Sequence, residues 1–342
     1  MLTPTQLTQI REKLESSQNP LFFFDNDADG LCSFIILQRA LGRGKGVAVK
    51  YPELNKNYLR KVNELRPDGV FILDKPQVSE DFIQELHSQN IPVTWIDHHN
   101  VKIKKELLEK VSYFNSYPSS EPVTYISYNV YKRKQDMWLA MIGCIGDVYM
   151  PDFAEEFSKQ NPELFNSSIP VFDCLYLTEI GKIVKILNFG LKDTTTNVLN
   201  MMRILIKAES PHDILEETPQ TKHLHYKFNQ INKEYTKIIE KAEHSLKGNL
   251  LFFTYAGATS MTSEISNELY FRHHDKKIVV VYKKQDTANI SFRGKDIKPI
   301  TEKAIKGLKD AIGGGHQDAT GARINIDDFP EFKKRIEKLI SS

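Results

Sequence analysis

Eight aspartate and histidine side chains in four short stretches are the residues of this sequence best suited to chemistry. They are Asp25, Asp27 and Asp29 in "FFFDNDADG", Asp74 in "FILDKP", Asp97, His98 and His99 in "WIDHHN", and Asp147 in "GCIGD". Carboxylates a few ångströms apart cannot all ionise unaided, so a cluster of them predicts strongly raised pKa values or a bound cation. Mixed aspartate and histidine ligation suits Mn²⁺ or a similar ion. Two such ions, about 3.5 to 4 Å apart, would form the clamp that serves phosphoryl hydrolysis.

The elements around these stretches predict that the residues meet. From residue 20 to 120, short apolar runs alternate with amphipathic segments, which is typical of a largely parallel sheet flanked by helices. The runs "LFFF", "GVFIL" and "VTWI" each end directly before one of the acidic stretches. Ligands of such sheets bind outside the carboxyl ends of the strands. We expect Asp147 late in a mostly apolar helix, where an unpaired charge is costly.

Each stretch taken alone also has a simpler structural explanation. An aspartate after a strand is often a helix N-cap, and Asp29 before "GLCSFIILQ" could have that role. A pair of histidines is more often surface or core filler than a ligand pair. The four stretches together, all at the ends of predicted elements, favour a metal site.

The remainder of the chain predicts a helical middle and a second, smaller α/β domain. We expect helices at 163–187 and 196–208, followed by one long polar helix at 223–247 that connects two domains. Four further strand candidates then occur, at 249–257, 276–284, 287–294 and 321–326. The predicted domains are residues 1–185, a helical region with the connecting helix at 186–248, and residues 249–342.

Composition sets limits on the class of protein. The 342 residues are 40% hydrophobic and 26% charged with a net charge of +2, which is ordinary for a globular protein and too mild to indicate a nucleic-acid binder by itself. The three cysteines are isolated, so no cysteine zinc site is expected. No apolar run reaches the length of a membrane span and the N-terminus has no signal-peptide pattern, so we expect a cytoplasmic protein.

The ordered stretches resemble the motifs of a known family, the DHH phosphoesterases. "DNDADG", the Asp74 of "FILDKP", "DHH" and the Asp147 of "GCIGD" look like its motifs I to IV in the right order, and "AIGGGHQDATGARI" resembles the signature of the associated DHHA1 domain. "DADGLCS" and "WIDHHN" are most similar to archaeal RecJ-like nucleases. The resemblance extends from about residue 20 to 325 and implies an N-terminal DHH domain, a connecting helix and a C-terminal DHHA1 domain.

The resemblance also implies roles for single residues. Asp27 and Asp74 would bind one metal ion, and Asp29, Asp74, His98 and Asp147 would bind a second, with Asp74 bridging the two. His99 would lie close to the scissile phosphate, and Asp97 would orient the histidine pair, as metal-bound imidazoles usually require. Asp25 stands where family members carry His or Asp, and it either joins the first metal's ligands or supports them from outside.

A second site is expected in the C-terminal domain. The residues are Gly313, Gly314, Gly315 and His316 of "GGGH", and Arg293 of "NISFRG". Successive glycines permit positive φ and let backbone N–H groups approach an anion as in a nest, and a guanidinium suits phosphate. A flexible glycine turn and a surface ion pair are the structural alternatives.

These features predict a manganese-dependent, RecJ-like exonuclease that cleaves single-stranded DNA or RNA, with two Mn²⁺ ions or, alternatively, Mg²⁺. The length leaves no room for the additional oligonucleotide-binding domain of large bacterial RecJ proteins. A small-substrate relative therefore stays open: an oligoribonuclease of the nanoRNase type, an adenosine bisphosphate phosphatase or a cyclic-dinucleotide hydrolase. A non-catalytic replication scaffold is a third hypothesis, although the acids of all four motifs are present. A nuclease of this type could work within a helicase, replication or repair assembly, and no membrane partner is expected.

Overall fold

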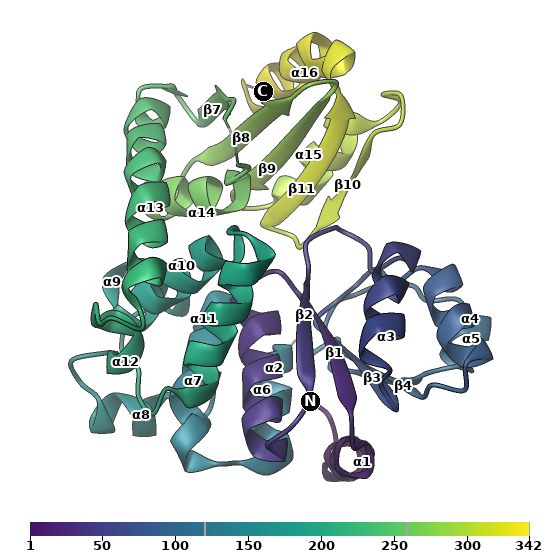
Figure 1. Ribbon diagram of the computed structural model, residues 1–342. Coiled ribbons are helices and arrows are strands. Elements are labelled where there is room, and N and C mark those ends of the chain that lie inside the picture. Colours follow the sequence, from purple (N-terminus) through teal and green to yellow (C-terminus); the bar gives the residue numbers. More distant parts are fainter. Residues whose placement is uncertain (120, 258, 342) are drawn as a thin grey trace. The chain divides into compact units, whose positions relative to one another are not determined.

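The computed structural model describes residues 1–119, 121–257 and 259–341, and it divides into two compact units, Met1–Phe228 and Asn229–Ser342. The boundary falls inside one continuous helix, α13 (Lys222–Glu243), which the sequence predicted as a long helix at 223–247 (Figure 1). None of the helices within the described ranges is long and apolar enough to cross a membrane.

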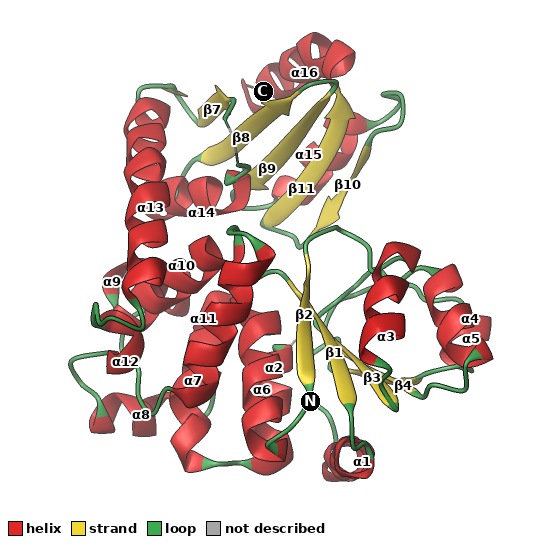
Figure 2. Cartoon of the chain, viewed as in Figure 1, coloured by secondary structure: helices red, strands yellow, loops and turns green. Residues whose placement is uncertain are grey.

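The N-terminal unit contains a five-stranded parallel sheet in the order β2-β1-β3-β4-β5. Figure 2 shows β2, β1, β3 and β4 in this order. Its strands are β1 (Pro20–Asp25), β2 (Lys45–Val49), β3 (Gly69–Leu73), β4 (Val93–Asp97) and β5 (Ser112–Asn115). Three of them, β1, β3 and β4, coincide with the apolar runs "LFFF", "GVFIL" and "VTWI". The chain leaves β1 for β2 on one side and returns past β1 to β3 on the other, so strand order reverses between β1 and β3.

Helices cover both faces of this sheet, which is why the strands are apolar on both sides. The helices between the strands are α2 (Ala28–Leu41), α3 (Leu59–Leu65), α4 (Glu80–Ser88) and α5 (Lys105–Leu108), and α1 (Pro4–Ser16) precedes them. Phe22 and Phe24 of β1 belong to the core that α2 covers, whereas Leu21 and Phe23 belong to the core that α3 and α4 cover. Figure 1 shows α2 and α3 on opposite sides of β1. The alternation follows from the two-residue period of a strand.

A layer of helices completes the unit on the α2 side. These helices are α6 (Val123–Tyr131), α7 (Met137–Gly146), α8 (Ala154–Gln160), α9 (Val171–Leu177), α10 (Glu179–Leu191), α11 (Thr195–Lys207) and α12 (His212–Leu215). The single helix expected at 163–187 is wrong. Pro170 precedes α9, and the extended Thr178 both ends α9 and caps α10, its Oγ1 accepting the Gly181 N–H at 3.0 Å.

The C-terminal unit contains a mixed six-stranded sheet in the order β10-β11-β9-β8-β7-β6. The strands are β6 (Leu246–Lys247), β7 (Leu250–Tyr255), β8 (Lys277–Lys284), β9 (Thr287–Arg293), β10 (Ile312–Gly315) and β11 (Ala319–Asn325), and the helices are α14 (Thr262–Arg272), α15 (Ile297–Ile305) and α16 (Phe329–Ser341). Only β7 and β8 pair in parallel. The four predicted strands are confirmed, and β6 and β10 are strands that the sequence did not indicate. The helix expected at 223–247 ends earlier than predicted, at Glu243, and β6 occupies its last two predicted residues.

Candidate metal centre

The acidic stretches lie where the sheet's strand order reverses. Asp25 ends β1, Asp74 follows β3, and Asp97 ends β4, so the three carboxylates leave the same edge of the sheet. Gly30 lets α2 begin close to this edge, because a Cβ there would lie 2.5 Å from the Asp25 carbonyl oxygen. This is the crevice in which sheets of the order 2-1-3-4-5 bind their ligands.

Two overlapping groups of side chains could each hold a metal ion. Asp74, His98 and His99 form one group and Asp29, His98 and Asp147 the other, with the ligand atoms of each group all within 4.8 Å of one another. His98 belongs to both, since its Nε2 lies 3.2 Å from Asp74 Oδ1 and its Nδ1 lies 3.5 Å from Asp147 Oδ2. Four of the residues predicted as metal ligands, Asp29, Asp74, His98 and Asp147, are therefore brought together.

Asp74 has the features of a residue held in place for a ligand. Its side chain is buried, yet its Oδ1 accepts no hydrogen bond among the described residues. A buried carboxylate oxygen without a donor is costly, and a cation would satisfy it. Its backbone adopts φ 56°, a left-handed conformation that aspartate tolerates better than most residues and that is often found at functional sites. The donor set therefore fits a divalent ion.

Asp29 is fixed by the first residues of α6. Its Oδ1 accepts the Thr124 N–H at 2.7 Å and its Oδ2 accepts the Val123 N–H at 2.9 Å. These are donors that a helix N-terminus leaves without an intrahelical partner, and the positive end of the helix dipole favours the carboxylate. Asp29 is not an N-cap, because Asp27 caps α2 by accepting the Gly30 N–H at 3.0 Å.

Asp97 orients the His99 ring through a hydrogen bond. Asp97 is fully buried, and its Oδ1 lies 2.8 Å from His99 Nδ1. A carboxylate accepts, so the Nδ1 carries the proton. The Asn115 side chain adds a bond from its Nδ2 to the His99 carbonyl oxygen at 2.9 Å. His99 is thus held at both its ring and its backbone.

Several carboxyl groups of the cluster have raised pKa values, because they lie close to one another and are poorly solvated. Burial, with the charges of Asp25 and Asp29, raises the pKa of Asp27 to about 7. Burial and neighbouring carboxylates raise the pKa of Asp74 well above its usual range. Asp147 lies at the end of α7 with its side chain 37% exposed, and desolvation together with the charge of Asp29 raises its pKa to about 8. A divalent ion would reverse these shifts by favouring the ionised forms.

The two histidines differ in their protonation. Burial lowers the pKa of His98, which favours the neutral imidazole that ligates metals. Burial would also lower the pKa of His99, but the hydrogen bond and charge of Asp97 outweigh it and raise that pKa. The neutral His98 imidazole is therefore suited to binding a metal ion, and the His99 imidazole is suited to carrying a positive charge.

Asp25 and Asp27 lie beside the two groups, and neither belongs to one. Asp25 Oδ1 instead forms an ion pair with Lys75 Nζ at 2.8 Å. Sequence reasoning missed Lys75, as it missed Asn115 and the α6 amides. Lys75 directly follows Asp74, so extending the search one residue past each strand end would have found it, whereas the α6 amides carry no side-chain signal.

The predicted phosphate residues of the C-terminal unit gather at one end of its sheet. Arg293 pairs with Ala319 and Gly315 with Thr320, which places the ends of β9 and β10 on either side of the start of β11. Arg293 Nε donates to Asn267 Oδ1 and its Nη1 donates to the Phe292 carbonyl oxygen. His316 is exposed and its N–H donates to the Ala319 carbonyl oxygen at 2.9 Å.

The glycine run has a different conformation from the expected nest. Gly313 and Gly314 are extended in the edge strand β10, and only Gly315 has a positive φ, 138°. A Cβ at Gly315 would lie 2.5 Å from the Ala319 carbonyl oxygen, so glycine is required there by packing. At Gly314 a Cβ would meet nothing within 4 Å among the described residues, so packing does not require glycine there. All four residues of β10 are exposed at the edge of the sheet.

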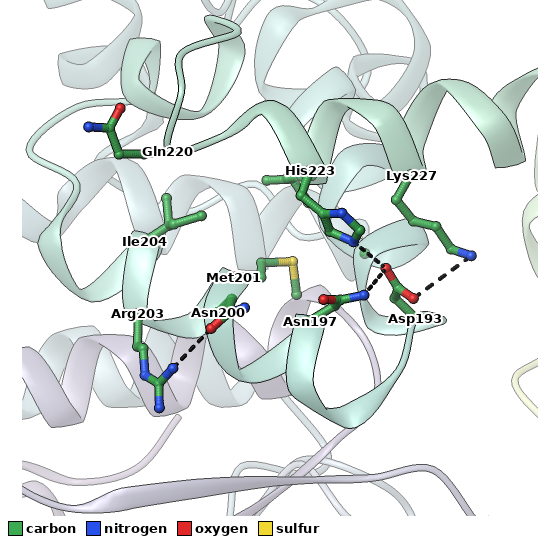
Figure 3. A pocket seen from close by; sticks show the side chains of 11 residues that line it. Asp193, Asn197, Asn200, Met201, Arg203, Ile204, Gln220, His223 and Lys227 are labelled. Atoms are coloured by element: carbon green, nitrogen blue, oxygen red, sulfur yellow. Dashed lines mark hydrogen bonds and ion pairs between the residues drawn. The ribbon is translucent and has the colours of Figure 1, made fainter.

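A separate hollow of about 310 Å³ lies among α10, α11 and the start of α13, and it contains none of the predicted site residues (Figure 3). Its polar groups bind one another: Asn197 and His223 contact Asp193 at 3.1 Å each, and Arg203 contacts Asn200 at 2.9 Å. Figure 3 shows these side chains directed at each other. We regard the cluster as a structural contact between helices.

Comparisons with known proteins identify the family. Residues 21–145 match the model of the DHH family N-terminal domain and residues 251–342 match the DHHA1 domain. The two matches together span more than half of the chain, which therefore belongs to the DHH family, with a DHHA1 domain after its DHH domain. A search among curated proteins gives no significant sequence match.

Solved structures place it more closely, with a RecJ-like fold. RecJ of Thermus thermophilus in complex with Mn²⁺ has a TM-score of 0.69 and 14% identity over 100% of this chain and 55% of that one, so the chain spans about half the length of that RecJ. An exonuclease RecJ bound to manganese has a TM-score of 0.64 and 15% identity, covering 98% and 94%. CDC45 from Entamoeba histolytica has a TM-score of 0.52 and 11% identity, covering 99% of both chains. At these identities the likeness concerns the fold.

Proposed function

We propose that the chain is a manganese-dependent exonuclease that hydrolyses phosphodiester bonds of single-stranded DNA or RNA. The observation that carries this proposal is the convergence of Asp29, Asp74, His98 and Asp147 on one edge of the sheet, with the buried Asp74 Oδ1 left without a hydrogen bond. The manganese in two of the similar RecJ structures makes Mn²⁺ the ion to test first, with Mg²⁺ as the alternative.

The carboxylates would hold two ions. Asp29, His98 and Asp147 would bind one, Asp27 would bind the other, and Asp74 would bridge them. Bound ions supply Lewis acidity and offset the charge that develops on the transferring phosphoryl group. The protein's own contribution is rigidity: Asp29 is held by two backbone amides and Asp74 by the backbone of β3 and β4, so the donors need little reorganisation.

His99 would contact the scissile phosphate. Its Nδ1 proton is committed to Asp97, and its raised pKa favours the imidazolium, which leaves Nε2–H to donate to a non-bridging phosphate oxygen. This contact would strengthen as negative charge accumulates in the transition state. Asp97 would act only through His99.

The C-terminal unit would bind the substrate's phosphates rather than react with them. Arg293 and His316 can supply positive charge, and the amides of Gly313, Gly314 and Gly315 lie on the exposed edge strand β10. Hydrogen bonds from guanidinium and backbone N–H groups position nucleic acid without reading its sequence.

A degradation ladder tests the proposal. The purified chain with Mn²⁺ is incubated with single-stranded DNA and RNA 20-mers carrying a label at the 5′ or the 3′ end, with EDTA and the Asp74→Asn variant as controls. We expect stepwise shortening from one end that both controls abolish. Measurable Mn²⁺ binding with every substrate left intact, a labelled dinucleotide included, would instead support a non-catalytic role.

A small-substrate phosphodiesterase is the second candidate, favoured by the size of the hollow beside Asp25. This hollow of about 340 Å³, lined in part by Lys50, Tyr51 and Lys75, falls in the range that accepts a small molecule. Nucleotide-sized substrates, including dinucleotides, adenosine bisphosphate and cyclic dinucleotides, would fit this function. Turnover of a labelled dinucleotide with negligible cleavage of the 20-mer would decide for this candidate and against the exonuclease.

A further inference from the structure

A buried lysine, Lys75, lies beside the predicted metal centre and forms an ion pair with Asp25. Lys75 Nζ lies 2.8 Å from Asp25 Oδ1, and the Lys75 side chain is 3% exposed. The same carboxylate oxygen also accepts the Asn26 N–H at 2.8 Å. Asp25 Oδ1 therefore has two donors, one of them fully charged.

The position of Lys75 is fixed by the fold. Its carbonyl oxygen accepts the indole N–H of the buried Trp95 at 2.9 Å, and Pro76 restricts its backbone to extended conformations. A lysine is rarely buried unless its charge is paired. Asp25 is the only carboxylate within ion-pair distance of Lys75 in the described part of the chain. The Lys75 charge therefore requires Asp25 as its partner, and because Lys75 is buried, the geometry of this ion pair does not depend on a mobile surface side chain.

The remaining acids are arranged differently. Asp29, Asp74 and Asp147 offer oxygens that converge on His98 or His99, whereas Asp25 and Asp27 lie outside both groups. These two acids differ in their partners: Asp25 forms an ion pair with Lys75, and Asp27 accepts the Gly30 N–H. We infer that Lys75 is a positioning residue that holds Asp25 outside the set of metal ligands, so that the centre is built from Asp27, Asp29, Asp74, His98 and Asp147. This inference rests on the proposed metal centre and answers the question that the sequence left open about Asp25.

Removing the pair as a unit tests the inference. Mn²⁺ binding to the full-length chain is measured by calorimetry, and free Mn²⁺ is counted by its EPR signal, for the wild type, Asp25→Asn/Lys75→Met and Asp74→Asn. The double change replaces both charges by neutral groups of similar size, which is often tolerated. Thermal unfolding checks that each variant is folded, and Asp74→Asn is the control that removes a predicted ligand.

We expect the double variant to bind the same number of Mn²⁺ ions as the wild type, with a Kd within threefold, while Asp74→Asn weakens binding at least tenfold. Loss of one equivalent of Mn²⁺ in the double variant, or a tenfold weaker Kd, would show that Asp25 is a ligand and overturn the inference. A wild type that binds no Mn²⁺ would overturn the metal centre itself, which distinguishes failure of the proposed function from failure of this inference.

Lys75→Met alone gives a second, independent measurement. It leaves Asp25 without its partner beside the metal centre, so Mn²⁺ should bind at least threefold more tightly, and Lys75→Arg should restore the wild-type Kd. If the double variant does not fold, the Kd of Lys75→Met alone tests whether Lys75 holds Asp25 outside the metal ligands. An unchanged or weaker Kd in Lys75→Met would contradict the pairing role.

Discussion

Asp27→Asn is expected to stabilise the metal-free protein while weakening its metal site. The substitution keeps the side-chain oxygen that accepts the Gly30 N–H and caps α2, and asparagine caps helices about as well as aspartate. It removes a negative charge that burial and the charges of Asp25 and Asp29 make unfavourable. Function and stability should therefore change in opposite directions.

The magnitude follows from the raised pKa. A shift from 3.8 to about 7 corresponds to a ceiling of about 4 kcal/mol at 1.36 kcal/mol per unit. The folded state binds the proton more tightly than the unfolded state, so stability falls as pH rises from 3.8 to 7 and the full penalty is present above pH 7. Without metal at pH 8, Asp27→Asn should be about 2 to 4 kcal/mol more stable than the wild type, and the two should converge near pH 4.

The assay is urea denaturation in EDTA at a series of pH values, with Mn²⁺ binding measured in parallel by calorimetry. Asp68→Asn is the matched control, because Asp68 accepts bonds from Ser17 and the Gln18 N–H that outweigh burial and lower its pKa. Its contribution is present above the ordinary aspartate pKa and is lost as pH falls, so Asp68→Asn should destabilise at neutral pH. Destabilisation of the metal-free protein by Asp27→Asn at pH 8 would refute the electrostatic reasoning.

Three further outcomes are expected. Asp74→Asn should lower the cleavage rate at least 10³-fold, about 4 kcal/mol in the barrier, because this carboxylate would serve both ions; wild-type turnover in a single-turnover assay would exclude the bridging role. Arg39→Met should cost about 3 kcal/mol, the low end of the range for a broken buried ion pair, since Arg39 pairs with the fully buried Asp136 at 2.6 Å while Arg133 keeps its contact with that carboxylate at 3.2 Å; Asp136→Leu in the same chain should recover part of that loss in urea unfolding. Arg293→Ala should raise KM about tenfold with kcat within twofold, and a lower kcat at unchanged KM would contradict a substrate-binding role.

Most strands of both sheets could be predicted from the sequence, and so could the convergence of Asp29, Asp74, His98 and Asp147. A strand buried on both faces must be continuously apolar, so "LFFF", "GVFIL" and "VTWI" identify themselves, and the polar residues that follow must lie at the strand ends. Elements were harder to predict where a segment can adopt either of two local structures, such as one helix or two, or a turn or a strand. Pro170 and Thr178 divide an apolar stretch into two helices, and Gly313 to Gly315 form an edge strand rather than a turn because β11 offers a partner.

The sequence by itself determined the sheet, the acidic edge and the family, since periodicity and motif order are properties of the chain in one dimension. Only the tertiary structure decided which groups satisfy each acid. Asp29 is held by backbone amides almost a hundred residues away, Asp97 holds His99, and Asp25 pairs with Lys75 while Asp74 keeps an oxygen without a hydrogen bond. Such partners depend on where distant elements come together, and in a low-dielectric crevice they decide which carboxylates are already neutralised and which are left for a metal ion.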